Sequence, residues 1–197
     1  MPGFLFGSGF VSVARLGNNA ATFFLDRAVN PFRWSFRTQC LFAFAVCAAL
    51  LAFAVYMQLK VGLVPCPLCI FQRIAFTATG VVFLVAGLHA PRGVTGQRIY
   101  SALALIAAGT GVGIAGRHVW LQHLPPDQVP SCGPGLDYMR ELMPLTSVIR
   151  KVLTGSGECA RVDWTLFGLS MAEWGLVWFL LLALWAAWLL VRRRRVM

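Results

Sequence analysis

The chain has 197 residues, of which 58% are hydrophobic and 12% are charged, and its mean hydropathy is +0.72. Soluble domains carry about 25% charged residues, so this composition excludes the soluble class and predicts a membrane protein. The formal net charge of +10 would suit a nucleic-acid partner. However, the basic residues are dispersed over short segments between apolar runs, which argues against nucleic-acid binding and indicates membrane topology instead.

Four apolar runs are long enough to cross a lipid bilayer as helices. A helix rises about 1.5 Å per residue, so about 20 residues span the hydrocarbon core. The predicted spans are residues 40–58, 70–90, 99–117 and 174–191. They form one predicted domain, residues 40–191, between an N-terminal tail of residues 1–39 and a basic tail of residues 192–197. We therefore expect an all-α membrane protein built as a four-transmembrane-helix bundle.

The charges orient these spans, because short cytoplasmic segments retain an excess of lysine and arginine. Three basic groups flank the spans on one side: Arg15, Arg27, Arg33 and Arg37, then Arg92 and Arg98, then Arg192 to Arg195. Six of the seven acidic residues lie between the third and fourth spans. Both termini are therefore predicted to be cytoplasmic, and the loops of residues 59–69 and 118–173 to face outward. The N-terminal tail has no basic region before its apolar start, so we expect no cleavable secretory signal.

The long outward segment has two recognisable parts. Prolines and glycines surround Cys132 and predict an irregular, exposed loop. Farther on, apolar residues recur at three- and four-residue spacing: Leu142, Leu145, Val148, Ile149, Val152 and Leu153. This pattern predicts a short amphipathic helix that lies flat on the membrane or covers the mouth of the bundle. Gly155 and Gly157 end it just before Cys159.

This topology divides the six cysteines into two groups. Cys40 and Cys47 lie in the first span on a similar helical face, where a cysteine acts as a small buried hydrophobe. The other four face outward, where disulfides form and persist: Cys66, Cys69, Cys132 and Cys159. Cys66 and Cys69 form a CxxC pair at the membrane edge. From that place a thiol pair can pass electrons between an external dithiol and a carrier dissolved in the bilayer.

Two other interpretations of the outward cysteines remain open. Four thiolates can bind zinc, although zinc ribbons normally have a second close pair, whereas Cys132 and Cys159 are far apart in sequence. An oxidising compartment also favours disulfides over thiolate ligands. Purely structural bridges in a non-catalytic, disulfide-stapled membrane scaffold are the other alternative. We predict redox exchange and no metal site.

Three stretches carry a resemblance to a known family: Cys66-Pro67-Leu68-Cys69-Ile70-Phe71-Gln72-Arg73, Arg117-His118-Val119-Trp120-Leu121-Gln122, and Gly157-Glu158-Cys159-Ala160 with Trp164, Phe167-Gly168-Leu169 and Trp174. Together with four spans and Cys132, these stretches resemble the DsbB family, the bacterial disulfide bond formation proteins B, over about residues 40 to 190. The N-terminal tail is longer than the family pattern requires. Cys40 and Cys47 match no family role.

The resemblance implies a bundle in the bacterial inner membrane that reoxidises the periplasmic dithiol oxidase DsbA and passes two electrons to a quinone, ubiquinone or menaquinone. It also implies two redox-active pairs, Cys132 with Cys159 and Cys66 with Cys69. The partner's thiolate would attack Cys132, Cys66 would exchange with Cys159, and Cys69 would face the quinone. The alternative is a quinone-linked paralogue that serves one dedicated partner. A vitamin K epoxide reductase-like bundle is disfavoured, because that family places its CxxC late in the chain.

Two further residues match the quinone side of the family. Arg73 lies one helical turn deeper than Cys69, and a fixed positive charge favours the thiolate form of a neighbouring cysteine. Its other possible role is an interfacial anchor that extends toward the membrane surface. His118 matches a family histidine near the quinone, where an imidazole can hydrogen-bond a ring oxygen or supply a proton, or it is only an interfacial donor at a helix end. Cys69, Arg73 and His118 are therefore the predicted quinone-binding residues.

Overall fold

The computed structural model describes residues 34–125, 127–130, 144, 146–147 and 157–192. Its long helices are α2 (Phe36–Tyr56), α3 (Pro67–His89), α4 (Val94–Gln122) and α8 (Met171–Val191). A π-helical turn, η2 (Met57–Val61), extends α2. Between α4 and α8 the chain forms a short helix, α7 (Gly157–Ala160), and an antiparallel hairpin of β1 (Thr165–Leu166) and β2 (Leu169–Ser170).

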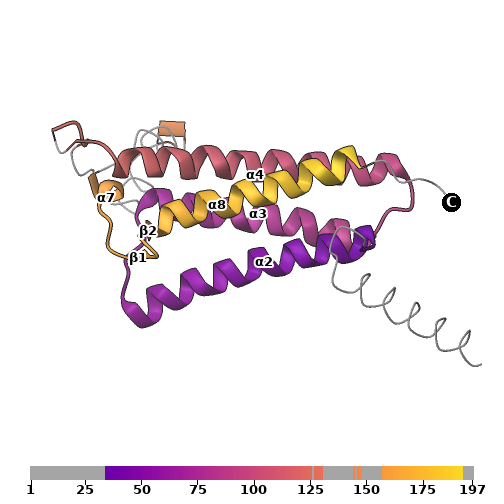
Figure 1. Ribbon diagram of the computed structural model, residues 1–197, viewed down its shortest axis with the longest axis horizontal. Helices are drawn as coiled ribbons and strands as arrows, with labels where there is room; N and C mark the ends of the chain where they lie inside the picture. The colour runs from indigo at the N-terminus through magenta and orange to yellow at the C-terminus, as the bar shows by residue number, and fades with distance from the viewer. Residues whose placement is uncertain (1–33, 126, 131–143, 145, 148–156, 193–197) are drawn as a thin grey trace, which may run out of the picture.

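The four long helices run side by side as one bundle (Figure 1). α8 packs along α4, α4 along α3, and α3 along α2, whereas α3 and α8 have only a small contact. The start of α3, α7 and the hairpin lie together at one end, which we call the Cys66 end. The start of α2, the turn between α3 and α4, and the end of α8 lie at the opposite end.

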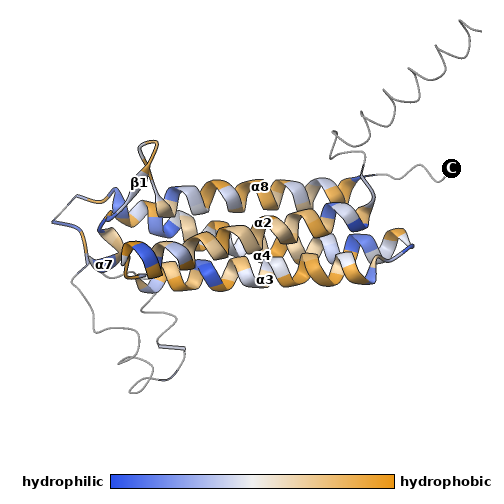
Figure 2. Cartoon of the chain, turned by 90° about the horizontal axis from the view of Figure 1, so that it is seen from below, coloured by the Kyte–Doolittle hydropathy of each residue, from blue (hydrophilic) through white to orange (hydrophobic). Residues whose placement is uncertain are grey.

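All four long helices are long and apolar enough to cross a membrane. Apolar residues predominate along the middle of the bundle, and many of the hydrophilic residues lie toward its two ends (Figure 2). This confirms the predicted all-α, four-helix membrane fold. α4 extends beyond its predicted span at both ends, so His118 lies within this helix instead of in the outward loop. The predicted amphipathic helix, around Leu142 to Leu153, and most of the N-terminal tail lie outside the described residues.

Side chains and glycines set the helix boundaries. Ser35 begins α2, because its Oγ accepts a hydrogen bond from the backbone N–H of Thr38 at 3.2 Å. Ser170 and Glu173 form a capping box at the start of α8. Gly62 ends the π-helical turn that follows α2, with φ = +76°, a conformation that favours glycine. The turn before Cys66 and the hairpin before α8 line one cavity at the Cys66 end.

Small residues bring α3 close to α2. A Cβ atom on Gly87 would lie 2.8 Å from Cδ2 of Leu41, and one on Gly80 would lie 3.1 Å from Cβ of Cys47. Cys40 and Cys47 are both buried against this interface. The interpretation of these two cysteines as small buried hydrophobes is therefore confirmed.

Gly111 brings α4 close to α8. A Cβ atom at this position would overlap the ring of Phe179 on α8. Phe179 is fully buried and stacks on Phe76 of α3, with ring centroids 3.8 Å apart. A single aromatic ring thus joins three helices, and the missing side chain of Gly111 makes room for it.

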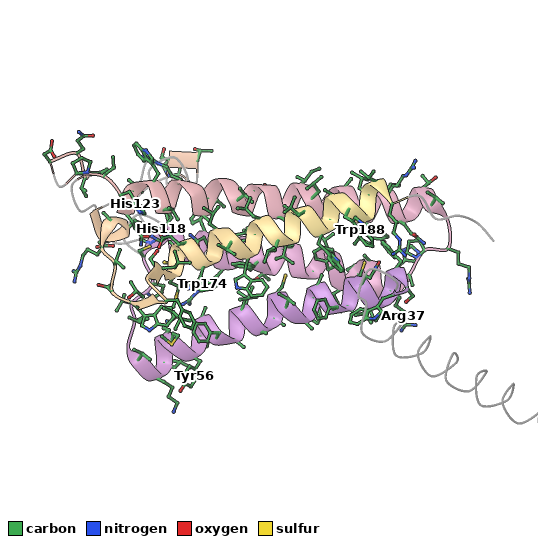
Figure 3. All side chains as sticks on the ribbon, viewed as in Figure 1. Arg37, Tyr56, His118, His123, Trp174 and Trp188 are labelled. Atoms are coloured by element: carbon green, nitrogen blue, oxygen red, sulfur yellow. The ribbon has the colours of Figure 1, made fainter. Side chains whose placement is uncertain are left out.

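A polar contact joins α2 and α8 at the opposite end of the bundle. Gln39 is fully buried on α2, and Nη1 of Arg192 donates to its Oε1 at 3.1 Å. The same guanidinium lies over the ring of Trp188, 4.8 Å from its centroid. Trp188 and Arg37 mark this end in Figure 3. The end of α8 is therefore fixed to the start of α2 far from the cysteines.

We expect Gly111→Ala to destabilise the bundle, because the added methyl group would meet the Phe179 ring. Overpacking a core costs about 1–3 kcal/mol, whereas replacing a helical glycine by alanine otherwise gains about 0.5–1 kcal/mol. Thermal unfolding in detergent, followed by circular dichroism, should give a lower midpoint. Gly113→Ala is the matched control, since nothing lies within 4 Å of a Cβ atom there. Equal midpoints for the two variants would contradict the close α4–α8 contact.

Candidate functional site

The CxxC pair builds the first turn of α3. Cys66 precedes the helix with extended backbone angles, and Pro67 occupies the first helical position, where its missing N–H costs nothing. The Cys66 sulfur accepts a hydrogen bond from the backbone N–H of Cys69 at 3.3 Å. The Cys66 thiol also donates to the Cys69 sulfur, and the two sulfur atoms are 3.2 Å apart. The start of the helix therefore holds the two thiols in contact.

The Cys66 thiol keeps its proton in this arrangement. Hydrogen bonds with the side chains of Cys159 and Cys69, followed by burial, raise the pKa of Cys66 above its ordinary value. A thiol that donates to a neighbouring sulfur must carry its hydrogen. Cys66 is therefore the protonated member of the pair.

A third sulfur reaches the pair from α7. Cys159 is buried and packs with Leu68 and Leu121, both of which are also fully buried. Leu68, which lies between Cys66 and Cys69 in sequence, fills the space between α3 and α7. Because Cys66 packs against the cluster that holds Cys159, two segments far apart in sequence bring three cysteines together.

His118 is buried within α4 at the Cys66 end of the bundle (Figure 3). Its Nδ1 lies 3.0 Å from Nε2 of Gln72 on α3, and its Nε2 lies 3.1 Å from the carbonyl oxygen of Cys159. The same Nε2 is 3.6 Å from the Cys66 sulfur. The ring of His118 thus contacts both α3 and α7 and lies beside the CxxC pair.

Arg73 extends from α3 toward the end of α2. Its Nη1 donates to Oε1 of Gln58 in the π-helical turn, and its Nη2 donates to the carbonyl oxygen of Ala54 at 3.2 Å. Such π-helical turns are frequent at functional sites. The guanidinium is therefore fixed between two helices, and it lines the same cavity as Cys69.

A cavity of about 720 Å³ lies between α2, α3 and α8 at the Cys66 end. Its apolar wall includes Leu50, Phe53, Phe76, Trp174 and Trp178. Its polar lining includes Cys69, Gln72, Arg73 and His118. Sites for small molecules typically measure about 300–1,000 Å³ and combine an apolar wall with a few convergent polar groups. The cavity therefore suits an apolar ligand whose polar end lies near Cys69.

Within the described ranges, one group of donor atoms has spacing that suits a metal ion: the sulfurs of Cys66 and Cys69 and the imidazole of His118 lie within 4.8 Å of one another. A zinc site needs each cysteine as a thiolate and usually takes four protein ligands when it is structural. Among the described residues this group supplies three ligand atoms, one fewer than a structural zinc site takes, and Nε2 of His118 faces a backbone carbonyl.

The comparison with known families decides the assignment, because the profile described as Disulfide bond formation protein DsbB matches residues 36–189. The chain belongs to the DsbB family. Curated relatives of the same name, disulfide bond formation protein B, cover most of its length. The protein from Xanthomonas axonopodis pv. citri (strain 306) is 55% identical over 167 residues, which are 85% of this chain and 97% of the relative. The protein from Xylella fastidiosa (strain 9a5c) is 49% identical over 156 residues, 79% of this chain and 90% of the relative.

Membership in the DsbB family assigns the chain to disulfide bond formation, with the role of a disulfide oxidase. The structure brings five of the predicted site residues together: Cys66, Cys69, Cys159, Arg73 and His118. The cysteines that it describes are free thiols, so the geometry is that of the reduced CxxC pair. Cys132 lies outside the described residues, and its pairing with Cys159 stays a prediction.

Two glutamines belong to this DsbB-family site although the sequence patterns do not single them out as site residues. Gln72 contacts His118, and Gln58 contacts Arg73. The polarity of these two residues was the signal present in the sequence, because burying an amide within an apolar span costs free energy unless the amide is hydrogen-bonded. Gln72 also follows Cys69 by three residues, which places both on the same face of a helix.

Leu68→Ala should loosen α7 and leave the long helices in place. Removing a buried leucine side chain costs about 2–5 kcal/mol, and the Leu68 side chain packs in one cluster with Cys159. We expect Cys159 of the reduced protein to react at least about tenfold faster with a maleimide, which corresponds to about 1.4 kcal/mol. Mass spectrometry of the alkylated peptides measures this rate.

The matched control for this experiment is Ile74→Ala on the same helix. Ile74 is 58% exposed, so its truncation leaves no cavity beside α7. Equal reactivity of Cys159 in the two variants would show that Leu68 does not hold α7 against the CxxC pair.

Proposed function

We propose that the chain is a thiol:quinone oxidoreductase that reoxidises a DsbA-type periplasmic dithiol oxidase and passes the two electrons to a membrane quinone. The position of the CxxC pair carries this proposal. Cys66 and Cys69 both line the cavity, and Cys66 also packs against the cluster that holds the buried Cys159. A thiol pair at this place can accept electrons from a protein disulfide relay on one side and give them to a small molecule on the other.

The proposal places the chain in the bacterial inner membrane with its Cys66 end at the periplasmic surface. Arg37, Arg92 and Arg192 lie toward the opposite end, which the positive-inside rule makes cytoplasmic. The four acidic residues that the structure describes lie instead near the Cys66 end: Asp127, Glu158, Asp163 and Glu173. In this orientation the cysteines meet the oxidising compartment.

The first exchanges transfer the disulfide to the partner protein. A partner thiolate attacks Cys132 of the Cys132–Cys159 disulfide, and Cys159 leaves as a thiolate. Cys159 then attacks Cys66 of the Cys66–Cys69 disulfide, and Cys69 leaves as a thiolate. The partner's second thiolate releases the partner as a disulfide and frees Cys132, which attacks Cys159 and frees Cys66. Each exchange conserves one disulfide and one thiolate, so the net result is an oxidised partner and a reduced Cys66–Cys69 pair.

The reduced pair then returns to its disulfide form. When bound, a quinone supplies the electron acceptor, because it takes up two electrons and two protons to become a quinol. The apolar wall of the cavity suits such a ring, and Arg73 presents a fixed positive charge there. Cys66 and Cys69 together lose two electrons as their bond re-forms, and Cys66 releases the proton that it holds in the reduced form. The second proton comes from water.

Purified protein, a reduced DsbA-type partner and a soluble ubiquinone analogue should give two coupled signals. We expect partner reoxidation to match quinone reduction mole for mole. Cys69→Ser and Cys132→Ser should each reduce the coupled rate to background, because either change breaks the thiol relay. Cys40→Ala is the control, since Cys40 is buried at the other end of the bundle. A wild-type protein whose cysteines stay oxidised in the presence of reduced partner would instead be a disulfide-stapled scaffold. A menaquinone analogue in a parallel assay identifies the acceptor.

Cys66→Ala protein that binds a quinone should absorb visible light. Without Cys66, the Cys69 sulfur cannot close a disulfide, and in its thiolate form it is an electron-rich group in the cavity proposed for the electron-poor quinone ring. Arg73→Met in the same background should weaken this absorption band strongly, whereas Arg73→Lys, which keeps the charge, should retain most of it. Absorption spectra of protein reconstituted with ubiquinone measure the band. If Cys66→Ala shows no band, Cys69 does not face the ring.

A further inference from the structure

Gln72 is a buried amide within an apolar helix. It is 7% exposed and lies three residues after Cys69 on α3. An amide in apolar surroundings costs free energy unless its donor and acceptor groups are satisfied. Its hydrogen-bond partners therefore indicate its role.

Gln72 begins a chain of hydrogen bonds that crosses from α3 to α7. Its Nε2 lies 3.0 Å from Nδ1 of His118, and Nε2 of His118 lies 3.1 Å from the carbonyl oxygen of Cys159. The carbonyl oxygen can only accept, so Nε2 of His118 carries a hydrogen. A neutral imidazole has a single N–H, so Nδ1 accepts and the amide of Gln72 donates. Together these contacts select one tautomer of His118.

Gly175 on α8 makes room for this amide. A Cβ atom on Gly175 would lie 2.8 Å from Oε1 of Gln72, closer than real side chains approach. Glycine therefore lets the amide lie against α8 while its Nε2 points at His118. A larger residue would displace the amide, because the end of a glutamine side chain moves more easily than a helix backbone.

We propose that Gln72 is a positioning residue for the exchange between Cys66 and Cys159. By fixing the tautomer and the orientation of His118, it holds the carbonyl of Cys159 and so keeps the Cys159 sulfur against Cys66. The exchange step belongs to the proposed function, but the positioning requires neither a quinone nor a partner protein. Because the proximity of two thiols sets their effective concentration, the positioning is measurable as an equilibrium.

The first experiment measures how readily Cys66 and Cys159 form a disulfide. In full-length protein with Cys69→Ser and Cys132→Ser, glutathione disulfide is the oxidant. Cys66 and Cys159 lose two electrons and two protons as their S–S bond forms, and glutathione disulfide becomes two glutathione molecules. The equilibrium constant gives the effective concentration of the two thiols. Gln72→Leu should lower it about tenfold, the effect of losing one buried hydrogen bond.

Three further variants separate positioning from general stability. Gln72→Glu keeps the length and accepts a hydrogen bond from Nδ1, so His118 still holds Cys159 and the effective concentration should stay close to that of the parent. Gly175→Ala should displace the amide and lower the value about as much as Gln72→Leu. Gly113→Ala on α4 places its methyl group in open space and should leave the effective concentration unchanged. Circular dichroism and thermal unfolding show whether each variant is folded.

The second experiment reports the tautomer of His118. Nitrogen-15 NMR of labelled histidine distinguishes protonated from unprotonated ring nitrogens, and a His118→Asn variant identifies the His118 signals among three histidines. Wild-type protein should carry the proton on Nε2 alone, and Gln72→Glu should carry protons on both nitrogens.

Either of two results would overturn the proposal. One is an unchanged effective concentration in Gln72→Leu, and the other is a neutral wild-type His118 with its proton on Nδ1. If instead both experiments give the expected results and the wild-type protein fails to couple partner oxidation to quinone reduction, only the proposed function fails.

Discussion

The first turn of α3 is the constraint on which the site depends. The first N–H groups of a helix have no partner within the helix, and here the Cys66 sulfur takes the place that a serine or aspartate oxygen usually fills. Pro67 fixes the backbone at the next position. Two cysteines with this spacing therefore meet through helix geometry alone, before any tertiary contact forms. His118 and α7 complete the site by packing against this turn, and the two cysteines of the turn line the cavity.

Paired polar groups give the apolar bundle its register. Apolar side chains pack in many similar ways, whereas a polar group in apolar surroundings is costly until it meets a specific partner. Such contacts between different helices include those of Gln39 with Arg192, Gln58 with Arg73, and Gln72 with His118. The first of them fixes the end opposite the cysteines, and the other two fix the walls around Cys69. The same contacts that align the helices therefore also shape the site.

Hydropathy and motif spacing predict the four helices, the CxxC pair and the residues around it, because each leaves a local pattern in the sequence. Hydropathy marks the hydrocarbon core but not the ends of a helix, so α4 continues past its predicted span and carries His118 with it. The packing of α7 against α4 cannot be predicted from such patterns. His118 contacts the backbone carbonyl of Cys159, and every residue type has a backbone carbonyl. The contact of Arg73 with the carbonyl of Ala54 is hidden for the same reason.

The cavity takes most of its apolar wall from α2 and α8, two helices of the bundle that also expose apolar side chains to the surroundings. The proposed quinone is apolar enough to partition into the bilayer before it binds. Its arrival is then a search in two dimensions, and the occupancy of the cavity follows the mole fraction of ligand in the lipid and not its concentration in water. Binding constants measured in detergent would accordingly change with the amount of detergent, because micelles dilute the ligand without altering the protein.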